Sequence, residues 1–505
     1  MPLAASQSRR IRTYVARIAS IAVALAAVAS ATPRAERLAH ADDSAASTVK
    51  PVTLPLARGK LGNGLEVIVH EDHRTPIVSV NLWYHVGSKD EPAGKNGFAH
   101  LFEHVMFQGS KHVPEDTYFR DLERAGATSI NGTTSSDRTN YFETVPKNRV
   151  ELALWLESDR MGFLLDHVDQ ATFASQRDVV KNERRQNFEN AQYGMVEQFI
   201  CAEMYPKGHP YHLLTIGSPE DLDAATLDDV KAFFRTWYVP NNATLVIAGD
   251  IDAAAALALA EKYFGPIPAG VVPDRSKWNE PPPVTLDGTK TISVAAGVEL
   301  PRVYLAWPTP PIFRSGDGEL DLASNILTGG KTSRLYKRLV YDLQVAESVY
   351  AYEQSEQLGS KYVIVATAQP GHTADDLRKT IDEELTRLAT DGVMADELAR
   401  AKANALSGMI FGLESDSARA NVINSYNQLA HDPGYLPKDM ERYATATTAS
   451  VTDAVRKYLP LDRRVVVLVK PDKAAPVSGV LEKVESTPAP SAPMTAPVTT
   501  VGGVR

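Results

Sequence analysis

Alternating strand-like and helix-like patterns fill the chain from residue 52 to about residue 250. Apolar residues recur at strand spacing, bounded by turn residues, in five runs: 52–58, 65–70, 77–86, 127–133 and 139–144. Three stretches with apolar residues at helical spacing and one buried strand follow, at 150–161, 171–190, 227–237 and 243–248. This order predicts an α+β fold in which helices pack on a mostly antiparallel sheet.

The second half of the chain repeats the pattern of the first. A helix, a Tyr-x-Pro sequence and an apolar strand end both segments, at Tyr238 and Tyr458, which are 220 residues apart (458 − 238). Near the start of the second segment, the apolar run 304–307 stands where 81–84 stands in the first. We therefore expect two homologous α/β-sandwich domains. Chance recurrence of a helix, Tyr-x-Pro and a strand is the alternative.

Composition narrows the class of protein. With 505 residues, of which 44% are hydrophobic, the chain can form more than one domain. The net charge of −9 argues against a nucleic-acid or anionic-membrane surface, which needs a basic patch. The single cysteine, Cys201, cannot form an internal disulfide, so stability must come from packing.

The two ends of the chain read differently from its centre. Arginines, a short apolar run and Ala39-His40-Ala41 predict a cleaved signal peptide over residues 1–41, and therefore export, to the periplasm if the source is bacterial. An uncleaved membrane anchor is the alternative, but the apolar run is shorter than the roughly 20 residues of a stable span. Residues 473–505, rich in Pro, Ala, Ser, Thr and Val, are expected to be a disordered tail.

One short stretch carries the clearest chemistry. His100 and His104 are one helical turn apart and Glu103 lies between them, while the neighbouring apolar residues point to the opposite face. Two imidazoles one turn apart suit Zn²⁺, and a carboxylate beside them suits a general base. The order H-x-x-E-H is the inverzincin signature. Two unrelated histidines on a polar helix face are the alternative.

A third ligand must come from elsewhere, because a catalytic zinc site usually has three protein ligands. Glu183 is the best candidate, since it lies in the middle of a single stripe on the helix 171–190 that also includes Gln176. The alternative is a solvated carboxylate beside Arg184 and Arg185. The second half contains no H-x-x-E-H, so metal chemistry is expected only in the first half.

The chain resembles the pitrilysin/insulinase-type metallopeptidases from about residue 52 to residue 470. The resemblance rests on H-x-x-E-H, on the segment 176–183, on the strand 129–133 and on the second-half sequence 329–335. It implies that one zinc ion per chain is held by His100, His104 and Glu183, with Glu103 as general base. It also implies that a peptide substrate contacts the strand residues Asn131, Gly132 and Thr133.

The resemblance also sets the expected domains and partners. We expect a zinc-binding catalytic domain at 52–270, a Pro-rich linker at 271–288 and a homologous domain at 289–472. The size resembles the short-subunit branch, whose members pair two subunits into a closed chamber, so we expect a homodimer or a heterodimer with a homologous subunit.

Three positions depart from the family pattern. Gln176 replaces a glutamate seven residues before the third ligand, where it could still hydrogen-bond near the site. Val340 and Glu347 stand where many relatives carry an Arg and a Tyr that hold the substrate carbonyl, unless the alignment shifts to Tyr350. A partner subunit would then supply this Arg/Tyr pair. The competing functions are a non-catalytic, peptide-binding or assembly subunit and, less simply, a zinc hydrolase of non-peptide amides.

Overall fold

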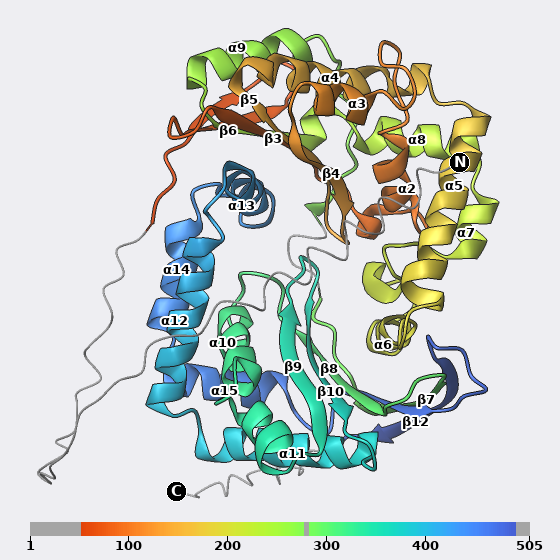
Figure 1. The fold of residues 1–505 in the computed structure, drawn as a ribbon, viewed down its shortest axis with the longest axis vertical. Helices are drawn as coiled ribbons and strands as arrows, with labels where there is room; N and C mark the ends of the chain where they lie inside the picture. The colour runs from red at the N-terminus through yellow and green to blue at the C-terminus, as the bar shows by residue number, and fades with distance from the viewer. Residues whose placement is uncertain (1–51, 277–281, 491–505) are drawn as a thin grey trace, which may run out of the picture. The chain divides into compact units, whose positions relative to one another are not determined.

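The computed structural model describes residues 52–276 and 282–490, and its first half is built on one six-stranded sheet (Figure 1). The strand order is β1-β2-β6-β3-β5-β4. The strands are β1 (Ala57–Lys60), β2 (Glu66–Glu71), β3 (Ile77–Tyr84), β4 (Thr128–Thr134), β5 (Thr139–Pro146) and β6 (Ala243–Gly249). All neighbours are antiparallel except β2 and β6, which are parallel.

The second half repeats this sheet in the order β12-β7-β11-β8-β10-β9. Its strands are β7 (Gly288–Ala296), β8 (Arg302–Thr309), β9 (Ala346–Gln354), β10 (Ser360–Ala368), β11 (Val465–Pro471) and β12 (Val480–Pro488). Again one inner pair, β7 and β11, is parallel and the other neighbours are antiparallel. The predicted α+β fold with two homologous halves is confirmed.

The two sheets differ in the origin of one edge strand: β1 comes from the start of the described chain, whereas β12, at the corresponding edge of the second sheet, comes from its end. In the first sheet β1 precedes β2 and pairs with it, whereas in the second sheet β12 follows β11 and pairs with β7 from Val480 to Pro488. The prediction of a disordered tail from residue 473 is therefore wrong up to residue 490. The side chains of β12 are nearly all exposed, so its strand forms through backbone pairing that composition does not reveal.

Both halves contain α-helices, most of which lie on one side of their own half's sheet. In the first half they are α2 (Phe98–Val105), α3 (Tyr118–Arg124), α4 (Val150–Phe163), α5 (Gln170–Arg184), α6 (Val196–Met204), α7 (Pro219–Ala224), α8 (Leu227–Trp237) and α9 (Ala253–Phe264). In the second half they are α10 (Asp317–Thr328), α11 (Ala374–Asp391), α12 (Ala395–Phe411), α13 (Asp416–Leu429), α14 (Leu436–Thr445) and α15 (Thr448–Tyr458). The single helix predicted at 171–190 is instead α5 followed by a π-helical turn, η4 (Arg185–Glu189).

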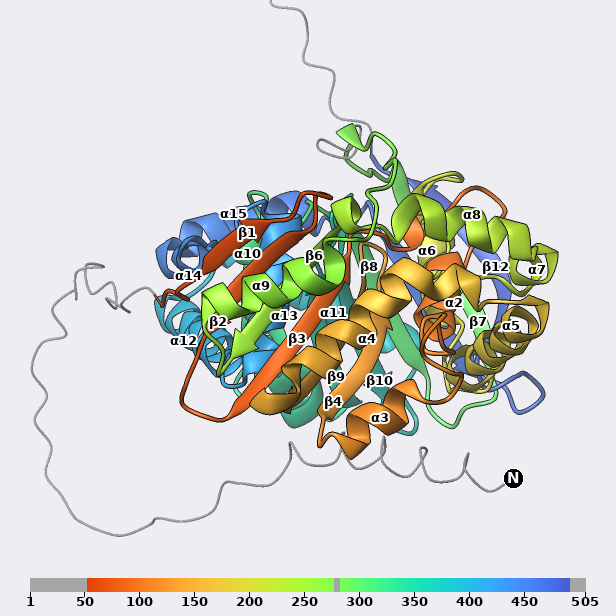
Figure 2. The same ribbon diagram turned by 90° about the horizontal axis from the view of Figure 1, so that it is seen from above.

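Each half places one helix on the open face of the other half's sheet (Figures 1 and 2). Helix α13 packs against β3 and β6, where Asn424 Nδ2 donates to the carbonyl of Asn81 at 2.9 Å. Helix α6 packs against β8 and β11, and its Val196 and Ile200 join the core formed by that face. Covering on both faces explains why β6 is buried along its whole length, as its apolar sequence predicts.

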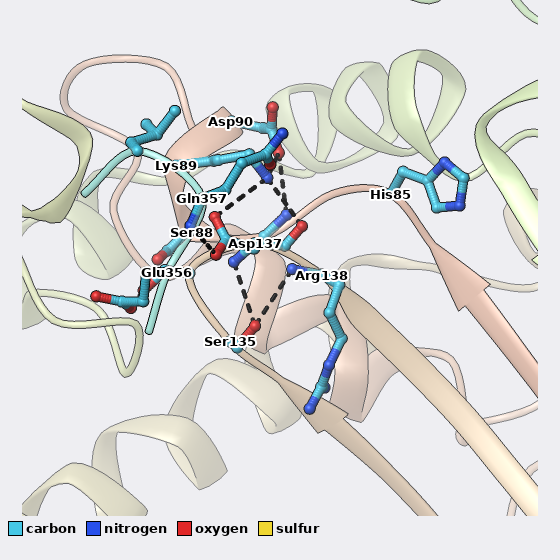
Figure 3. A network of polar contacts seen from close by, with 12 residues as sticks. His85, Ser88, Lys89, Asp90, Ser135, Asp137, Arg138, Glu356 and Gln357 are labelled. Carbon is cyan, nitrogen blue, oxygen red and sulfur yellow. Dashed lines mark hydrogen bonds and ion pairs between the residues drawn. The ribbon is translucent and has the colours of Figure 1, made fainter. Parts of the chain in front are cut away.

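A polar network also joins the halves, at the hairpin between β4 and β5 (Figure 3). Asp137 accepts hydrogen bonds from the Tyr211 hydroxyl at 2.6 Å and from the backbone N–H of Gln357 at 2.9 Å. Ser136 donates to Glu356 at 2.7 Å. The hairpin beside β4 is therefore held against the β9–β10 hairpin of the second half.

The remaining predictions about the ends of the chain concern other residues. The predicted signal peptide, residues 1–41, lies outside the described residues. Within the described residues, no helix has the length and apolar character needed to span a membrane.

Candidate metal centre

Helix α2 separates an apolar face from a polar one, as its sequence spacing predicts. Phe98, Leu101, Phe102 and Val105 are fully buried in the core of the first half. His100, Glu103 and His104 are only partly buried and lie on the opposite face, toward α5 and β4. Because the apolar face packs into the core, the side chains of the polar face can form a metal site.

Helix α5 brings a carboxylate to the two histidines. Glu183 Oε2 lies 3.6 Å from His100 Nε2 and 3.4 Å from His104 Nε2. The two Nε2 atoms lie 3.4 Å from each other. The structure therefore brings together the three groups that the sequence suggested as ligands, although Glu183 comes 79 residues after His104 in the chain (183 − 104).

This triangle fits a zinc ion. Zn–N and Zn–O bonds of about 2.0–2.1 Å in a tetrahedral site place two ligand atoms about 3.3–3.4 Å apart. The observed separations of 3.4–3.6 Å are close to this value. Two imidazoles and a carboxylate are also a common donor set for zinc. Glu183 is the last residue but one of α5, and the π-helical turn η4 begins two residues after it. Such turns often occur at functional sites.

The electrostatics favour neutral imidazole beside an ionised carboxylate. Burial, together with the neighbouring His104, lowers the pKa of His100 to about 4. The hydrogen bond with His104 lowers the pKa of Glu183. At neutral pH, His100 is therefore uncharged, and the neutral imidazole is the form that binds a metal ion.

Glu103 lies between α2 and the edge strand β4. A Cβ atom at Gly132 would stand only 3.1 Å from Glu103 Cγ, so the strand passes directly beneath this side chain. Burial raises the pKa of Glu103, which favours the protonated form. The carboxylate oxygen and the ligand nitrogens of His100 and His104 all lie within 4.8 Å of one another. The group is thus placed to exchange a proton with a molecule bound at the centre.

The predicted substrate contacts lie on β4, which among the described strands pairs only with β5, so that its other edge is open. Gly132 faces Glu103, whereas the neighbours Asn131 and Thr133 alternate to the other face. Thr133 donates its hydroxyl to Asn140 at 2.6 Å, so this side chain already has a partner. An added strand would meet the backbone of these three residues.

The positions that depart from the family pattern have different surroundings. Gln176 is buried on α5, two turns before Glu183. Val340 packs against the core of the second half from the π-helical turn η8 (Tyr336–Asp342). Glu347 is exposed on the edge strand β9, and Tyr350 on the same strand is 44% exposed.

Two side chains near the centre were not singled out from the sequence. The carboxylate of Glu91 accepts backbone hydrogen bonds at the start of α2, and Arg184, next to Glu183, donates to the carbonyl of Gly217. One signal was available for Glu91, because Gly97 at the start of a helix has no side chain to cap it. No local signal pairs Arg184 with Gly217.

Comparisons with known proteins agree with this arrangement. A family model described as insulinase, peptidase family M16, matches residues 66–215, and one described as the peptidase M16 inactive domain matches residues 224–405. The first match includes H-x-x-E-H and Glu183. The second begins near the end of the first half, at residue 224, and continues into the half without the motif.

Individual relatives point the same way. Zinc protease PqqE of Helicobacter pylori is 31% identical over 373 residues, which cover 72% of this chain and 82% of that protein. The uncharacterized zinc protease Rv2782c of Mycobacterium tuberculosis is 26% identical over 85% of this chain and 94% of its own. The crystal structure of a protease from Helicobacter pylori matches with a TM-score of 0.77 at 28% identity, covering 83% of this chain and 100% of that one. The chain therefore belongs to the insulinase family of peptidases, family M16.

Proposed function

We propose that this protein is a zinc-dependent endopeptidase that hydrolyses peptides or unfolded polypeptides. The observation that carries the proposal is the triangle of His100, His104 and Glu183, with ligand-atom separations of 3.4–3.6 Å and Glu103 beside it. The relatives named zinc proteases support the same class of activity.

The three ligands would hold one zinc ion per chain. When bound there, zinc lowers the pKa of a water molecule and polarises a peptide carbonyl. Glu103 accepts the proton of the attacking water and returns it to the leaving amine. Its raised pKa suits both steps, since a base that must also act as an acid works best when its pKa is near the working pH.

The open edge of β4 would bind the substrate as an additional strand. Backbone hydrogen bonds along the segment 131–133, made by the residues whose N–H and C=O groups point to the open edge, would hold the peptide beside Glu103 with little dependence on its sequence. The absence of a Cβ at Gly132 leaves room for the Glu103 side chain above the strand.

A second subunit would complete the site. Val340 is apolar and packed into a core, and Glu347 is an acidic residue, so neither can donate a hydrogen bond to a substrate carbonyl. We therefore infer that a homologous subunit, as a heterodimer or homodimer partner, supplies the Arg/Tyr pair. Gln176 would hydrogen-bond near the site without contributing charge.

Gln176, together with Val340 and Glu347 in place of the Arg/Tyr pair, favours a second candidate function, a non-catalytic or assembly subunit that binds peptides. The intact set of ligands and Glu103 count against this candidate. We also propose export through the apolar N-terminal segment. The E. coli relative PqqL, described as a periplasmic protease and 28% identical to this chain over 236 residues, supports that location.

Cleavage of a quenched fluorescent peptide separates the two functions. We expect the zinc-loaded protein, alone or with a homologous subunit that carries the Arg/Tyr pair, to cleave the peptide. Glu103→Gln should keep its zinc and cleave about 10²–10⁴ times more slowly. If wild type and Glu103→Gln cleave equally slowly with a full complement of zinc in every combination, the endopeptidase proposal is wrong.

A further inference from the structure

The start of helix α2 is capped by a residue that lies outside the helix. Gly97 stands at the N-cap position with φ of +101° and has no side chain to accept a hydrogen bond. Glu91, six residues earlier, takes this role: its Oε2 accepts from the N–H of Gly97 at 3.0 Å and its Oε1 from the N–H of Ala99 at 2.9 Å. The Asn96 side chain also donates to Oε2, at 3.1 Å.

The second half shows why an outside cap is needed. Helix α10, which holds the place of α2, also begins at a glycine in the left-handed region, Gly316, with φ of +105°. There the helix caps itself, because Glu319, three residues on, accepts from the N–H of Gly316 at 3.2 Å. The residue three positions after Gly97 is His100. A metal ligand therefore occupies the position that would otherwise supply the cap, and Glu91 replaces it.

The same turn connects α2 to the helix of the third ligand. Gly97 packs against Gly217 so closely that a Cβ atom on Gly97 would lie 2.7 Å from the Gly217 Cα. The carbonyl of Gly217 accepts a hydrogen bond from Arg184 Nη1 at 2.9 Å. Arg184 is the immediate neighbour of Glu183, its side chain is 7% exposed, and its Nη2 donates to Gln198 at 2.6 Å.

A continuous chain of contacts thus runs from Glu91 through Gly97 and Gly217 to Arg184. It joins the first turn of α2 to the last turn of α5, and the two helices lie side by side in Figures 1 and 2. The backbone of Asn96 adds a second link, because its N–H donates to Asp221 on α7 at 2.9 Å. The distance between the two helices decides how far Glu183 lies from His100 and His104.

We propose that Glu91 and Arg184 are positioning residues of the metal centre, which set the separation and orientation of the two helices that carry the ligands. The proposal rests on the zinc site of the proposed function. Neither residue touches the ligand atoms, so both act through the backbone of Gly97 and Gly217.

The first test measures zinc affinity by competition with a chelating dye, which needs no activity. Glu91→Gln replaces one acceptor oxygen by an NH₂ group, which cannot accept the N–H hydrogen bonds that surround it. We expect zinc to bind about 10–100 times more weakly, as is typical when a residue that orients metal ligands is replaced. Arg184→Met, which keeps the packing volume but loses the donors, should weaken zinc in the same range. Arg184→Lys, which retains one donor, should recover part of the loss.

Glu220→Gln is the matched control. Glu220 is an exposed carboxylate in the first turn of α7, close in sequence to Gly217, and its replacement should leave zinc affinity unchanged within twofold. Thermal unfolding of each zinc-free variant, recorded in parallel, measures effects on stability alone.

The visible absorption spectrum of the Co²⁺-substituted protein reports ligand geometry and gives a second readout. We expect the bands of Glu91→Gln and Arg184→Met to shift or weaken, and those of Glu220→Gln to match wild type. If the two variants are merely less stable when zinc-free but bind zinc and Co²⁺ as wild type does, the positioning role is wrong while the proposed function stands. If they bind zinc more weakly but wild type cleaves no peptide with any partner, the proposed function is wrong while the positioning role stands.

Discussion

Helices α2 and α10 occupy the same place in the two halves but differ in what their polar positions do. Helix α2 follows β3 and α10 follows β8, strands that hold the same place in their sheets, and both helices begin at a glycine in the left-handed region. Within its own half, α2 packs against α5 and α10 packs against α12. Counting from Gly97 and Gly316, the residues at the positions of His100, Glu103 and His104 are Glu319, Leu322 and Ala323.

In α10 these three positions stabilise the fold instead of forming a metal site. Leu322 and Ala323 are fully buried in the core of the second half, and Glu319 caps its own helix. In the first half the same positions face Glu183 and the edge strand β4. The comparison shows that the backbone of the repeat does not specify chemistry. The half with the site also needs a cap from outside its helix.

The strongest test makes α2 resemble α10. Replacing Glu103 by Leu together with His104 by Ala should abolish zinc binding and peptide cleavage, because one ligand and the base are lost. The helix should persist, since leucine and alanine are good helix formers and α10 carries them at these positions. Zinc content by atomic absorption, peptide cleavage and circular dichroism check this outcome. A folded double variant that still holds one zinc per chain would show that the ligands lie elsewhere.

A second test concerns the hairpins that meet between the halves. Burial raises the pKa of Glu356, on the β9–β10 hairpin, to about 7 from an ordinary value of 4.5. The folded state therefore keeps a proton that the unfolded state has lost, so this residue reduces stability as the pH rises from about 4.5 to 7. The loss is at most about 3 kcal/mol.

Glu356→Gln should remove this dependence. Its free energy of unfolding relative to wild type should increase between pH 5 and pH 8, as measured by urea unfolding at each pH. Glu66→Gln, a partly buried glutamate that accepts from Asn427, serves as the comparison variant. A Glu356→Gln difference that stays constant over this range would contradict the assignment.

The smallest expected effect concerns the edge strands. Gly132 on β4 corresponds to Ala351 on β9 by the pairing of the strands. Gly132 pairs with Tyr141, which pairs with Leu82 on its other side. In the second half, Ala351 pairs with Ile364, which pairs with Leu305. Gly132→Ala copies the second half, and its methyl group would lie 3.0–3.1 Å from Phe107, Glu103 and Tyr141.

Because Glu103 must move, we expect cleavage to fall about tenfold, which corresponds to roughly 1.4 kcal/mol, with zinc affinity unchanged. Gly62→Ala, at an exposed glycine with no atom within 4 Å of the added methyl group, should behave as wild type. Equal kcat/KM for Gly132→Ala and Gly62→Ala would show that the fit of Glu103 over β4 does not matter.

Much of the fold could be predicted from local patterns. Strong apolar runs such as 243–248 and helical stripes such as 227–237 match β6 and α8 within one residue, because both elements bury a face that the sequence must keep apolar. Strand β12 was missed, because it pairs through its backbone while exposing its side chains. The break in the long helix at Arg185 also has no local signal, since a π-helical turn changes hydrogen bonding without changing composition.

The sequence by itself determined that His100, Glu103 and His104 share one helix face, since a helical turn brings residues four apart together. Only the tertiary structure decided that Glu183 lies 3.4–3.6 Å from both histidines, because that distance depends on how α2 and α5 pack. It also decided that Glu91 and Arg184 connect these helices, since the connection depends on Gly97 packing against Gly217, 120 residues further along the chain (217 − 97). Local spacing sets which side chains share a face, whereas packing sets the distances on which binding depends.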